Sequence, residues 1–225
     1  MKKLIIFDCD GVLVADFDRK KYAKFVKSFL EKHKAFDRGS PEEIVKKQSD
    51  MWEDIQDDAL VGRISQTEAN ALWIEKLGLD RRLAKEFVRG DMKFWEESVK
   101  SRPIDEIMMT LKKLRGSGYS LAVLSNDVRE SSLKKKILSW VGLDRYLDRV
   151  YTSHSIGHVK PEKEAYLHIV KDFGSKPDQT VFVGHEEYEL KGAKDTGLRV
   201  VCLREKPWAQ ADFNIKRFPD LLEIL

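Results

Sequence analysis

Short runs of consecutive apolar residues recur along the chain, separated by longer stretches of mixed polar and apolar residues. Four clear runs and two weaker ones predict strands: Leu4–Phe7, Leu121–Leu124, Val181–Val183, Arg199–Leu203, Arg149–Thr152 and Phe213–Ile215. Runs of this length are typical of strands buried on both faces of a parallel sheet. Helical stretches lie between the later runs, at Ser131–Val141, Lys163–Phe173 and Glu189–Thr196. Strands that alternate with helices predict an α/β fold with a doubly wound, mainly parallel sheet.

The segment over residues 16–100 breaks this alternation. It has no convincing strand, but two helix-start signals, Ser40–Glu43 and Ser65–Glu68, each combine a serine cap with a glutamate three residues later. Its tryptophans are spaced like the apolar core of a helical bundle: Trp52, Trp73 and Trp95. We therefore expect an all-helical domain over residues 16–100, inserted into an α/β domain made of residues 1–15 and 101–225.

Composition and charge narrow the class of protein. The chain has 225 residues, of which 42% are hydrophobic and 35% charged, which is ordinary for a globular protein with a sizeable core. Its formal charge is +3 and no basic block stands out, so we expect neither a nucleic acid nor a membrane as a partner. No apolar run is long enough for a signal peptide or a membrane span, which favours the cytoplasm. Cys9 and Cys202 lie in apolar runs and are expected to be buried thiols.

Two carboxylates directly follow the first apolar run. Because side chains alternate along a strand, Asp8 and Asp10 can project together while Cys9 points back into the core. The carboxyl ends of parallel strands line the ligand crevice of an open sheet. Two desolvated carboxylates are costly there unless a cation or a reaction uses them. The alternative is that both aspartates cap the following turn.

Other polar residues follow the later apolar runs. They are Ser125 and Asn126 after the second run, Lys160 before a helix, and the stretch from His185 through Glu186 to Glu189. Taken singly, these features also fit a helix cap, a solvent-facing loop and a helix start that favours negative side chains. Their order along the chain is more informative than any one of them.

In that order, four segments resemble the sequence motifs of the haloacid dehalogenase superfamily. They are Phe7–Val12, Leu124–Asn126, Lys160-Pro161 and Val183–Gly197. The resemblance covers about residues 1–15 and 101–225, and it implies a Rossmann-like α/β core. The inserted helical segment resembles the cap that closes over small substrates in this superfamily.

The resemblance implies a role for each matching residue. Asp8 is the nucleophile that becomes an aspartyl phosphate. Asp10 protonates the leaving oxygen and then activates water. Ser125 donates to a phosphoryl oxygen, and Lys160 neutralises charge on the phosphate and the nucleophile.

Three further residues are candidates for substrate contacts. The backbone at Gly11 and the amide of Asn126 would complete an anion pocket. Arg63 lies between two predicted helices of the inserted segment. It would either reach the site or remain a solvated loop residue.

The resemblance also implies a divalent cation, Mg²⁺, held by Asp8 and by the backbone carbonyl of Asp10. The fourth motif departs from the family pattern, because His185 and Glu189 stand where the family usually has aspartates. Three interpretations stay open. Glu186 or Glu189 supplies the oxygen ligand, or His185 ligates and favours Mn²⁺, Co²⁺ or Ni²⁺, or the metal binds weakly and the protein is catalytically impaired.

Asp10 also favours one branch of the superfamily. Dehalogenases and phosphonate-cleaving relatives do not protonate an ester oxygen and usually lack an aspartate at that position. We therefore expect a metal-dependent phosphatase that hydrolyses a phosphate monoester of a small metabolite, as a monomer or a small homo-oligomer. Two alternatives fit the same motifs: a sugar-phosphate mutase, and a catalytically silent relative that binds a phosphorylated ligand or a protein partner.

Overall fold

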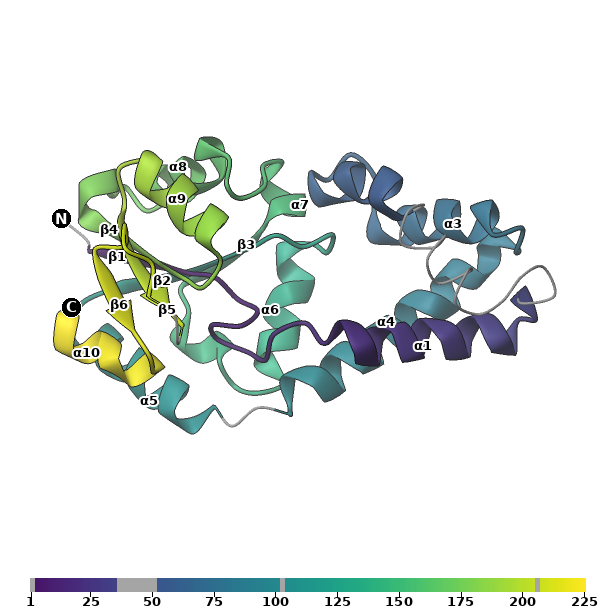
Figure 1. The fold of residues 1–225 in the computed structure, drawn as a ribbon, viewed down its shortest axis with the longest axis horizontal. Coiled ribbons are helices and arrows are strands. Elements are labelled where there is room, and N and C mark those ends of the chain that lie inside the picture. Colours follow the sequence, from purple (N-terminus) through teal and green to yellow (C-terminus); the bar gives the residue numbers. More distant parts are fainter. Residues whose placement is uncertain (1–2, 36–51, 102–103, 205–206) are drawn as a thin grey trace.

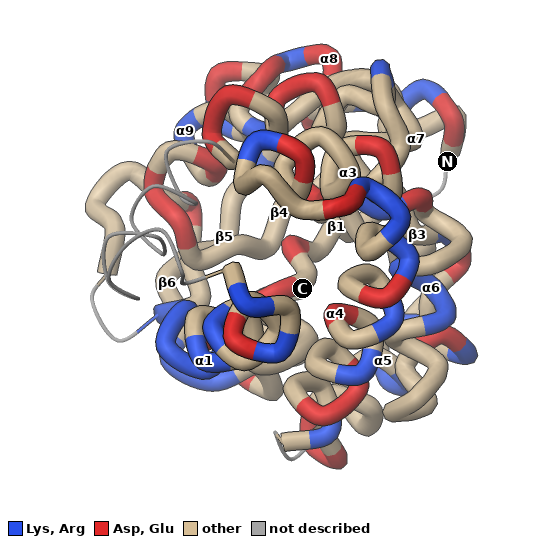
Figure 2. The backbone as a smooth tube through the Cα atoms, turned by 90° about the vertical axis from the view of Figure 1, so that its right-hand side faces the viewer, with Lys and Arg blue, Asp and Glu red and all other residues tan. Residues whose placement is uncertain are grey.

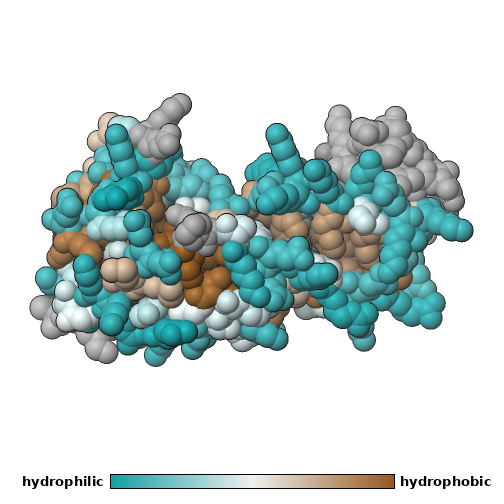
Figure 3. Space-filling view, turned by 90° about the horizontal axis from the view of Figure 1, so that it is seen from below, coloured by the Kyte–Doolittle hydropathy of each residue, from teal (hydrophilic) through white to brown (hydrophobic). Residues whose placement is uncertain are grey.

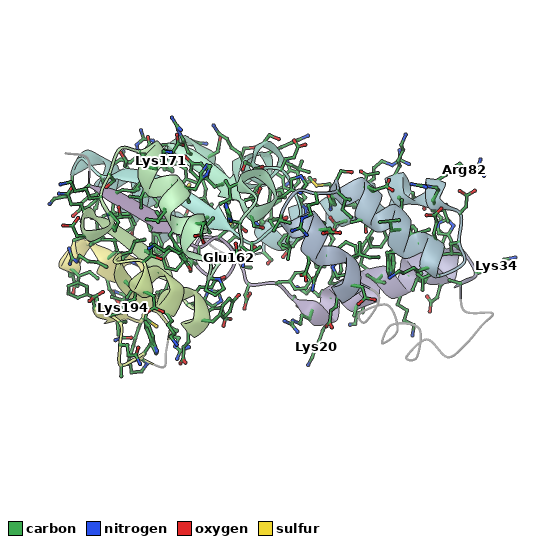
Figure 4. The ribbon with its side chains drawn as sticks, turned by 90° about the horizontal axis from the view of Figure 1, so that it is seen from above. Lys20, Lys34, Arg82, Glu162, Lys171 and Lys194 are labelled. Atoms are coloured by element: carbon green, nitrogen blue, oxygen red, sulfur yellow. The ribbon has the colours of Figure 1, made fainter. Side chains whose placement is uncertain are left out.

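The computed structural model describes residues 3–35, 52–101, 104–204 and 207–225. It has two bodies, an α/β body that contains the sheet and a helical body beside it (Figure 1). The molecule is elongated, with Lys34 and Arg82 at the end of the helical body that is far from the sheet (Figure 4). The helix start predicted at Ser40–Glu43 lies outside the described residues.

A parallel sheet of six strands forms the centre of the α/β body, in the order β3-β2-β1-β4-β5-β6. The strands are β1 (Leu4–Phe7), β2 (Ser120–Ser125), β3 (Arg149–Thr152), β4 (Thr180–Gly184), β5 (Arg199–Leu203) and β6 (Phe213–Ile215). Every pairing between them is parallel. The doubly wound sheet predicted from the apolar runs is confirmed, including its two weaker strands.

Strand β1 lies at the point where the strand order reverses. Its last residue, Phe7, pairs with Val123 of β2 on one side and with Val183 of β4 on the other. In open α/β sheets, ligands bind at this switch point, beyond the carboxyl ends of the strands. The residues that follow Phe7 therefore lie where a binding site is expected.

Helices cover both faces of the sheet (Figure 1). On one face lie α5 (Asp105–Gly116), α6 (Ser131–Ser139) and α10 (Leu221–Ile224), and on the other lie α8 (Lys163–Asp172) and α9 (Glu187–Asp195). The shorter helical elements are η3 (Asp144–Tyr146), α7 (Ser153–Ile156), η4 (Pro177–Gln179) and η5 (Phe218–Asp220). Side chains alternate along β1, so Phe7 packs against the first set of helices and Ile6 against the second. The three helices predicted from the sequence correspond to α6, α8 and α9.

The helical body is built from the segment between β1 and α5. It contains α1 (Arg19–Lys32), a helix over residues 52–60, α3 (Gln66–Lys76), η2 (Arg81–Leu83) and α4 (Ala84–Val99). Leu30, Trp73 and Phe87, from α1, α3 and α4, share a hydrophobic cluster that is separate from those of the sheet. None of the six strands comes from the described residues between 16 and 100. This segment therefore has a hydrophobic core of its own.

One of the three tryptophans differs from the prediction. Trp73 is buried in the helical cluster and Trp52 packs against it, but Trp95 belongs to the cluster that α5 and α6 form with the sheet. The reason is the direction of α4, which leaves the helical body and runs back to the α/β body (Figure 1). Its last turns carry Trp95 and Val99 out of the helical core. The prediction of Trp95 as a bundle-core residue is therefore wrong.

The two bodies also touch through α7. The Nδ1–H of His154 donates a hydrogen bond to the carbonyl oxygen of Ala59 at 2.7 Å. Gly62 lies beside this contact with φ +71°, and a Cβ there would come within 2.2 Å of the carbonyl oxygen of His154. Only glycine permits this approach. The loop that follows residues 52–60 therefore rests directly on the backbone of α7.

Charge and hydrophobicity are unevenly spread over the surface. Lysine and arginine residues are concentrated on α1, which has six of them against one glutamate (Figure 2). Hydrophilic residues cover most of the face seen in Figure 3, with hydrophobic patches on both bodies. Among the residues that the structure describes, no helix has the length and apolar character needed to cross a membrane.

The helix start predicted at Ser65–Glu68 is confirmed, because Oγ of Ser65 accepts a hydrogen bond from the backbone N–H of Glu68 at 3.1 Å. Ser65→Ala removes this acceptor from the first turn of α3, and we expect the free energy of unfolding to fall by about 0.5–2 kcal/mol. Urea unfolding followed by circular dichroism measures the change. Ser65→Asp is the control, since aspartate also caps helices and should stay close to the parent. An alanine variant as stable as the parent would contradict this role.

Candidate active site

A cavity of about 510 Å³ lies between the two bodies, beyond the carboxyl ends of β1, β2 and β4. The α/β body lines it with residues that the sequence singled out: Asp8, Asp10, Ser125, Asn126, Lys160, His185, Glu186 and Glu189. The helical body adds residues that the sequence did not single out for the site: Tyr22, Trp52, Gln56, Leu60 and Asp91. Both bodies therefore contribute to a single cavity.

Asp8 continues β1 beyond its last strand residue. Its backbone N–H donates to the carbonyl oxygen of Val183 at 2.9 Å, which anchors the residue at the switch point. Its Oδ1 accepts hydrogen bonds from the N–H of Cys9 at 2.8 Å and from Nζ of Lys160 at 2.5 Å. Burial by itself would raise the pKa of Asp8, but Lys160 and His185 outweigh burial and lower that pKa below its usual value. Asp8 is therefore a carboxylate at neutral pH, as a nucleophile must be.

Lys160 lies between two buried carboxylates. Its Nζ is 2.5 Å from Oδ1 of Asp8 and 2.9 Å from Oε2 of Glu189, and its side chain is 1% exposed. Burial alone would lower the pKa of Lys160, but these two carboxylates raise it. The side chain of Asn126 holds the lysine backbone, because its Nδ2 donates to the Lys160 carbonyl at 2.9 Å and its Oδ1 accepts from the Lys160 N–H at 2.8 Å. Asn126 thus positions Lys160.

Asp10 lines the same cavity as Asp8, and the intervening Cys9 is fully buried with a free thiol. Both carboxylate oxygens of Asp10 accept hydrogen bonds from Nζ of Lys134, at 3.2 Å to Oδ1 and 3.0 Å to Oδ2. Burial raises the pKa of Asp10 although Lys134 opposes the increase. One ionised carboxylate beside one carboxyl group of raised pKa is the pairing that nucleophilic and acid–base roles require.

The ring of His185 packs against Gly11, where a larger residue would collide with it. Gly11 has φ +78°, and a Cβ there would come within 2.6 Å of Cε1 of the ring. Nδ1 of His185 lies 3.2 Å from Oδ2 of Asp8, an ion-pair distance without hydrogen-bond geometry. Nε2 lies 3.5 Å from Oε1 of Glu186. Contact with the Asp8 carboxylate raises the pKa of His185 despite its partial burial.

The residues predicted to ligate a metal do not converge on one point. Glu189 is engaged by Lys160 at 2.9 Å and by the hydroxyl of Tyr188 at 3.1 Å. The side chain of Glu186 is 51% exposed. At the position where the third oxygen ligand was expected, the chain has the imidazole of His185. Within the described parts of the chain, no three His, Cys, Asp or Glu side chains are grouped so that they could hold a metal ion. Since Mg²⁺ demands a near-octahedral set of oxygens, this donor set does not fit the ion that the resemblance implied.

Two predicted substrate contacts lie elsewhere. The N–H of Gly11 donates to the carbonyl oxygen of Val14 at 3.1 Å, within a tight loop. The side chain of Arg63 is 72% exposed and pairs with Asp58 at 2.7 Å. Neither Gly11 nor Arg63 lines the cavity. In this structure Gly11 provides space for His185, and Arg63 is a solvated loop residue, the alternative that the sequence left open.

Sequence reasoning missed the buried charges behind Asp10. Asp127 lies 3.0 Å from Nζ of Lys134 and 2.9 Å from the guanidinium of Arg129, and all three side chains are buried. A signal for Lys134 was present in the sequence, because it lies one turn before Ile137 on the buried face of α6. A lysine on an apolar helix face needs a buried partner of opposite charge.

Gly11→Ala tests the packing of the histidine ring. A residue with a Cβ at this positive φ costs about 1–2 kcal/mol, and the collision with His185 should add to that cost. His185→Ala removes the ring, so the double variant should lose less stability than the sum of the two single variants. Urea unfolding of the three variants and the parent measures this difference. Strictly additive losses would show that the ring and Gly11 are not in contact.

Comparisons with known proteins agree with the fold. A pyrophosphatase, PpaX of Halalkalibacterium halodurans, is 26% identical over 130 residues, which cover 55% of this chain and 60% of that protein. A phosphoglycolate phosphatase of Aquifex aeolicus is 28% identical over 161 residues, 68% of this chain and 73% of that protein. The chain thus matches only about three fifths of the length of the first relative.

A solved structure of a HAD phosphatase from Thermococcus onnurineus has the same fold, with a TM-score of 0.72 at 21% identity over 100% of this chain and 97% of that chain. The family model described as haloacid dehalogenase-like hydrolase matches residues 2–197, which include the switch-point strand and all four motif segments. This match and the order of the strands in the sheet agree. The chain belongs to the haloacid dehalogenase-like hydrolases.

Proposed function

We propose that this chain hydrolyses a phosphate monoester of a small metabolite, with Asp8 as the nucleophile. The observation that carries this function is the pairing, in one cavity, of the ionised Asp8 with Asp10, whose pKa is raised. Lys160 lies against Asp8, where its charge would also stabilise an incoming phosphoryl group. Ser125 is buried at the end of β2, lines the same cavity, and is the proposed donor to a phosphoryl oxygen.

In the proposed first step, Oδ2 of Asp8 attacks phosphorus. Oδ1 already accepts hydrogen bonds from Cys9 and Lys160, whereas the 3.2 Å contact of Oδ2 with Nδ1 of His185 lacks hydrogen-bond geometry, so Oδ2 keeps the more available electron pair. A bond forms between Oδ2 and phosphorus while the bond from phosphorus to the leaving oxygen breaks. Asp10 gives its proton to that oxygen, and the leaving group departs as an alcohol.

In the proposed second step, Asp10 is a carboxylate and takes a proton from a water molecule. The water oxygen attacks the phosphorus of the aspartyl phosphate, and the bond from phosphorus to Oδ2 of Asp8 breaks. Inorganic phosphate leaves. Asp8 is again a carboxylate and Asp10 again carries a proton, so both residues return to their starting states.

Compact, polar phosphate compounds are the proposed substrates. The cavity of about 510 Å³ has a size typical of small-molecule sites, and the helical body forms one side of it. We propose that this body, residues 16–100, acts as a cap that limits the size of the leaving group. The two relatives are named for pyrophosphate and phosphoglycolate, which are small phosphate compounds. Phosphoglycolate, a monoester, is therefore the first candidate to test, and pyrophosphate, an anhydride, tests whether the site accepts other small phosphate compounds.

A screen of phosphorylated metabolites for release of inorganic phosphate tests the proposed activity. Phosphoglycolate, pyrophosphate and a set of sugar phosphates form the panel, each assayed with a chelator and with several divalent cations. A sugar-phosphate mutase would convert a sugar phosphate to an isomer without net release of phosphate. A silent relative would bind ligands without turnover. Either outcome would replace the proposed function.

The two aspartates are tested by isosteric replacement. Asp8→Asn removes the nucleophilic charge, so phosphate release should fall to background. Asp10→Asn removes the acid and should lower kcat by about 10²–10⁴-fold. Asp178→Asn, an exposed aspartate outside the cavity, is the control and should match the parent. Near-parent turnover by Asp8→Asn would exclude the aspartyl-phosphate route.

His185 decides how this chain treats divalent cations. His185→Asp places a carboxylate beside Asp8, so it should bind Mg²⁺ more tightly than the parent, because Mg²⁺ prefers oxygen ligands. If the imidazole itself ligates, the parent should bind Mn²⁺, Co²⁺ or Ni²⁺ more tightly than Mg²⁺. Titration calorimetry of each cation with both proteins measures these affinities without an activity assay. Identical cation preferences in the parent and in His185→Asp would exclude ligation by His185.

A further inference from the structure

Lys134 is a buried lysine directly beside Asp10. It lies on α6, and its side chain is 1% exposed. Its Nζ donates to both oxygens of Asp10, at 3.2 and 3.0 Å, and lies 3.0 Å from Oδ2 of Asp127. Lysine is almost never fully buried unless it is paired, and here two carboxylates pair it. The ammonium group of Lys134 therefore lies in the buried interior of the site, beside Asp10 and Asp127.

The orientation of Asp10 depends on this contact. Within the part of the chain that the structure describes, Lys134 is the one side chain that hydrogen-bonds to the Asp10 carboxyl group. The carboxyl group also faces the cavity, since the Asp10 side chain is 25% exposed. Proton transfer requires the acid to lie within hydrogen-bond reach of the leaving oxygen, and small misplacements are costly. An ammonium group that contacts both oxygens fixes the direction in which the carboxyl group points.

Lys134 is itself held by a chain of alternating charges. Asp127 contacts Lys134 through Oδ2 and accepts a hydrogen bond at Oδ1 from the guanidinium of Arg129 at 2.9 Å. Arg129 donates in turn to Oδ2 of Asp91 at 2.6 Å. Asp91 belongs to α4, so the chain of charges crosses from the α/β body to the helical body. The ring of Trp95 lies beside both cations, 4.8 Å from Arg129 and 5.2 Å from Lys134.

We propose that Lys134 is a positioning residue that aims Asp10 at the leaving oxygen. The chain of charges extends this role to the helical body, because Asp91 holds Lys134 in place through Arg129 and Asp127. This role rests on the function proposed above, in which Asp10 protonates the leaving oxygen.

The leaving group determines how strongly this positioning affects the rate. An alkyl phosphate releases a strongly basic alkoxide unless its oxygen is protonated as the bond breaks. The compound para-nitrophenyl phosphate releases a weakly basic phenolate, which departs without a proton. Misplacing Asp10 therefore slows formation of the aspartyl phosphate from the alkyl substrate and largely spares its formation from the aryl substrate. Hydrolysis of the aspartyl phosphate, which also uses Asp10, is the same step for both substrates. A general structural defect lowers both rates by a similar factor.

The test compares kcat/KM, which reports the steps up to formation of the aspartyl phosphate, for para-nitrophenyl phosphate and for an alkyl phosphate that the parent hydrolyses. In Lys134→Met, kcat/KM for the alkyl phosphate should fall about 10- to 100-fold, part of the full contribution of general acid catalysis. The value of kcat/KM for the aryl substrate should change little. Lys134→Arg keeps the charge and should recover part of the loss. Lys136→Met changes an exposed lysine on the same helix, so it is the matched control and should behave like the parent.

Asp91→Asn tests the far end of the chain of charges. It should lower the ratio of alkyl to aryl kcat/KM in the same direction as Lys134→Met, but by less. If thermal unfolding shows that Lys134→Met does not fold, Lys134→Arg and Asp91→Asn decide the question. Parent-like ratios in both would overturn the proposed role. Equal losses of kcat/KM on both substrates in a folded Lys134→Met would overturn it as well.

Asp10→Asn, assayed beside these variants, separates the two proposals. If its kcat/KM falls by the same factor for the alkyl and the aryl substrate, the acid role of Asp10 in the proposed function fails. If Asp10→Asn lowers kcat/KM selectively for the alkyl substrate and Lys134→Met does not, the acid role stands and the positioning role of Lys134 fails.

Discussion

The buried carboxylate of Asp8, at the end of β1, requires a partner of opposite charge, and the rest of the site is arranged to provide one. Asp8 is ionised in the interior, and an ion there is tolerated only with a close partner of opposite charge. Lys160 provides it from a loop 152 positions further along the chain, and Glu189 of α9 is the second partner of that lysine. Leaving one of these charges unpaired costs about 3–5 kcal/mol. The three charges therefore fix the relative positions of three segments, which are β1, the loop before α8, and α9. The shape of the cavity depends on these positions.

Asp8 and Asp10 are two residues apart, yet they belong to separate groups of charges. Asp8 is tied to Lys160 within the α/β body, whereas Asp10 is tied through Lys134 to charges that reach the helical body. In the first group, Lys160 and His185 outweigh burial and keep Asp8 ionised. In the second, burial and the nearby Asp127 raise the pKa of Asp10 although Lys134 opposes the increase. Different surroundings thus prepare two identical side chains for different chemistry.

His185 alters the site without disturbing the backbone around it. Its ring occupies the space that the absent side chain of Gly11 leaves, and its Nδ1 faces the oxygen of Asp8 that Lys160 does not contact. The helix that follows still begins beside it and still delivers Glu189 to Lys160. The departure from the family pattern is therefore local: an imidazole stands where a carboxylate is usual, while the positions of Asp8 and Lys160 are held by other contacts.

The sequence alone determined the strands, the helices between them and the set of residues beyond β1. Those features follow from local patterns: apolar runs, helix caps such as Ser65, and the alternation of side chains along a strand. Only the tertiary structure decided which side chains contact one another. Glu189 faces Lys160, Arg63 turns to Asp58 in solvent, Trp95 leaves the helical core, and Lys134 is buried against Asp10. The physical reason is that a charge or a ring finds its partner through the meeting of segments far apart in sequence, and no local pattern records which segments will meet.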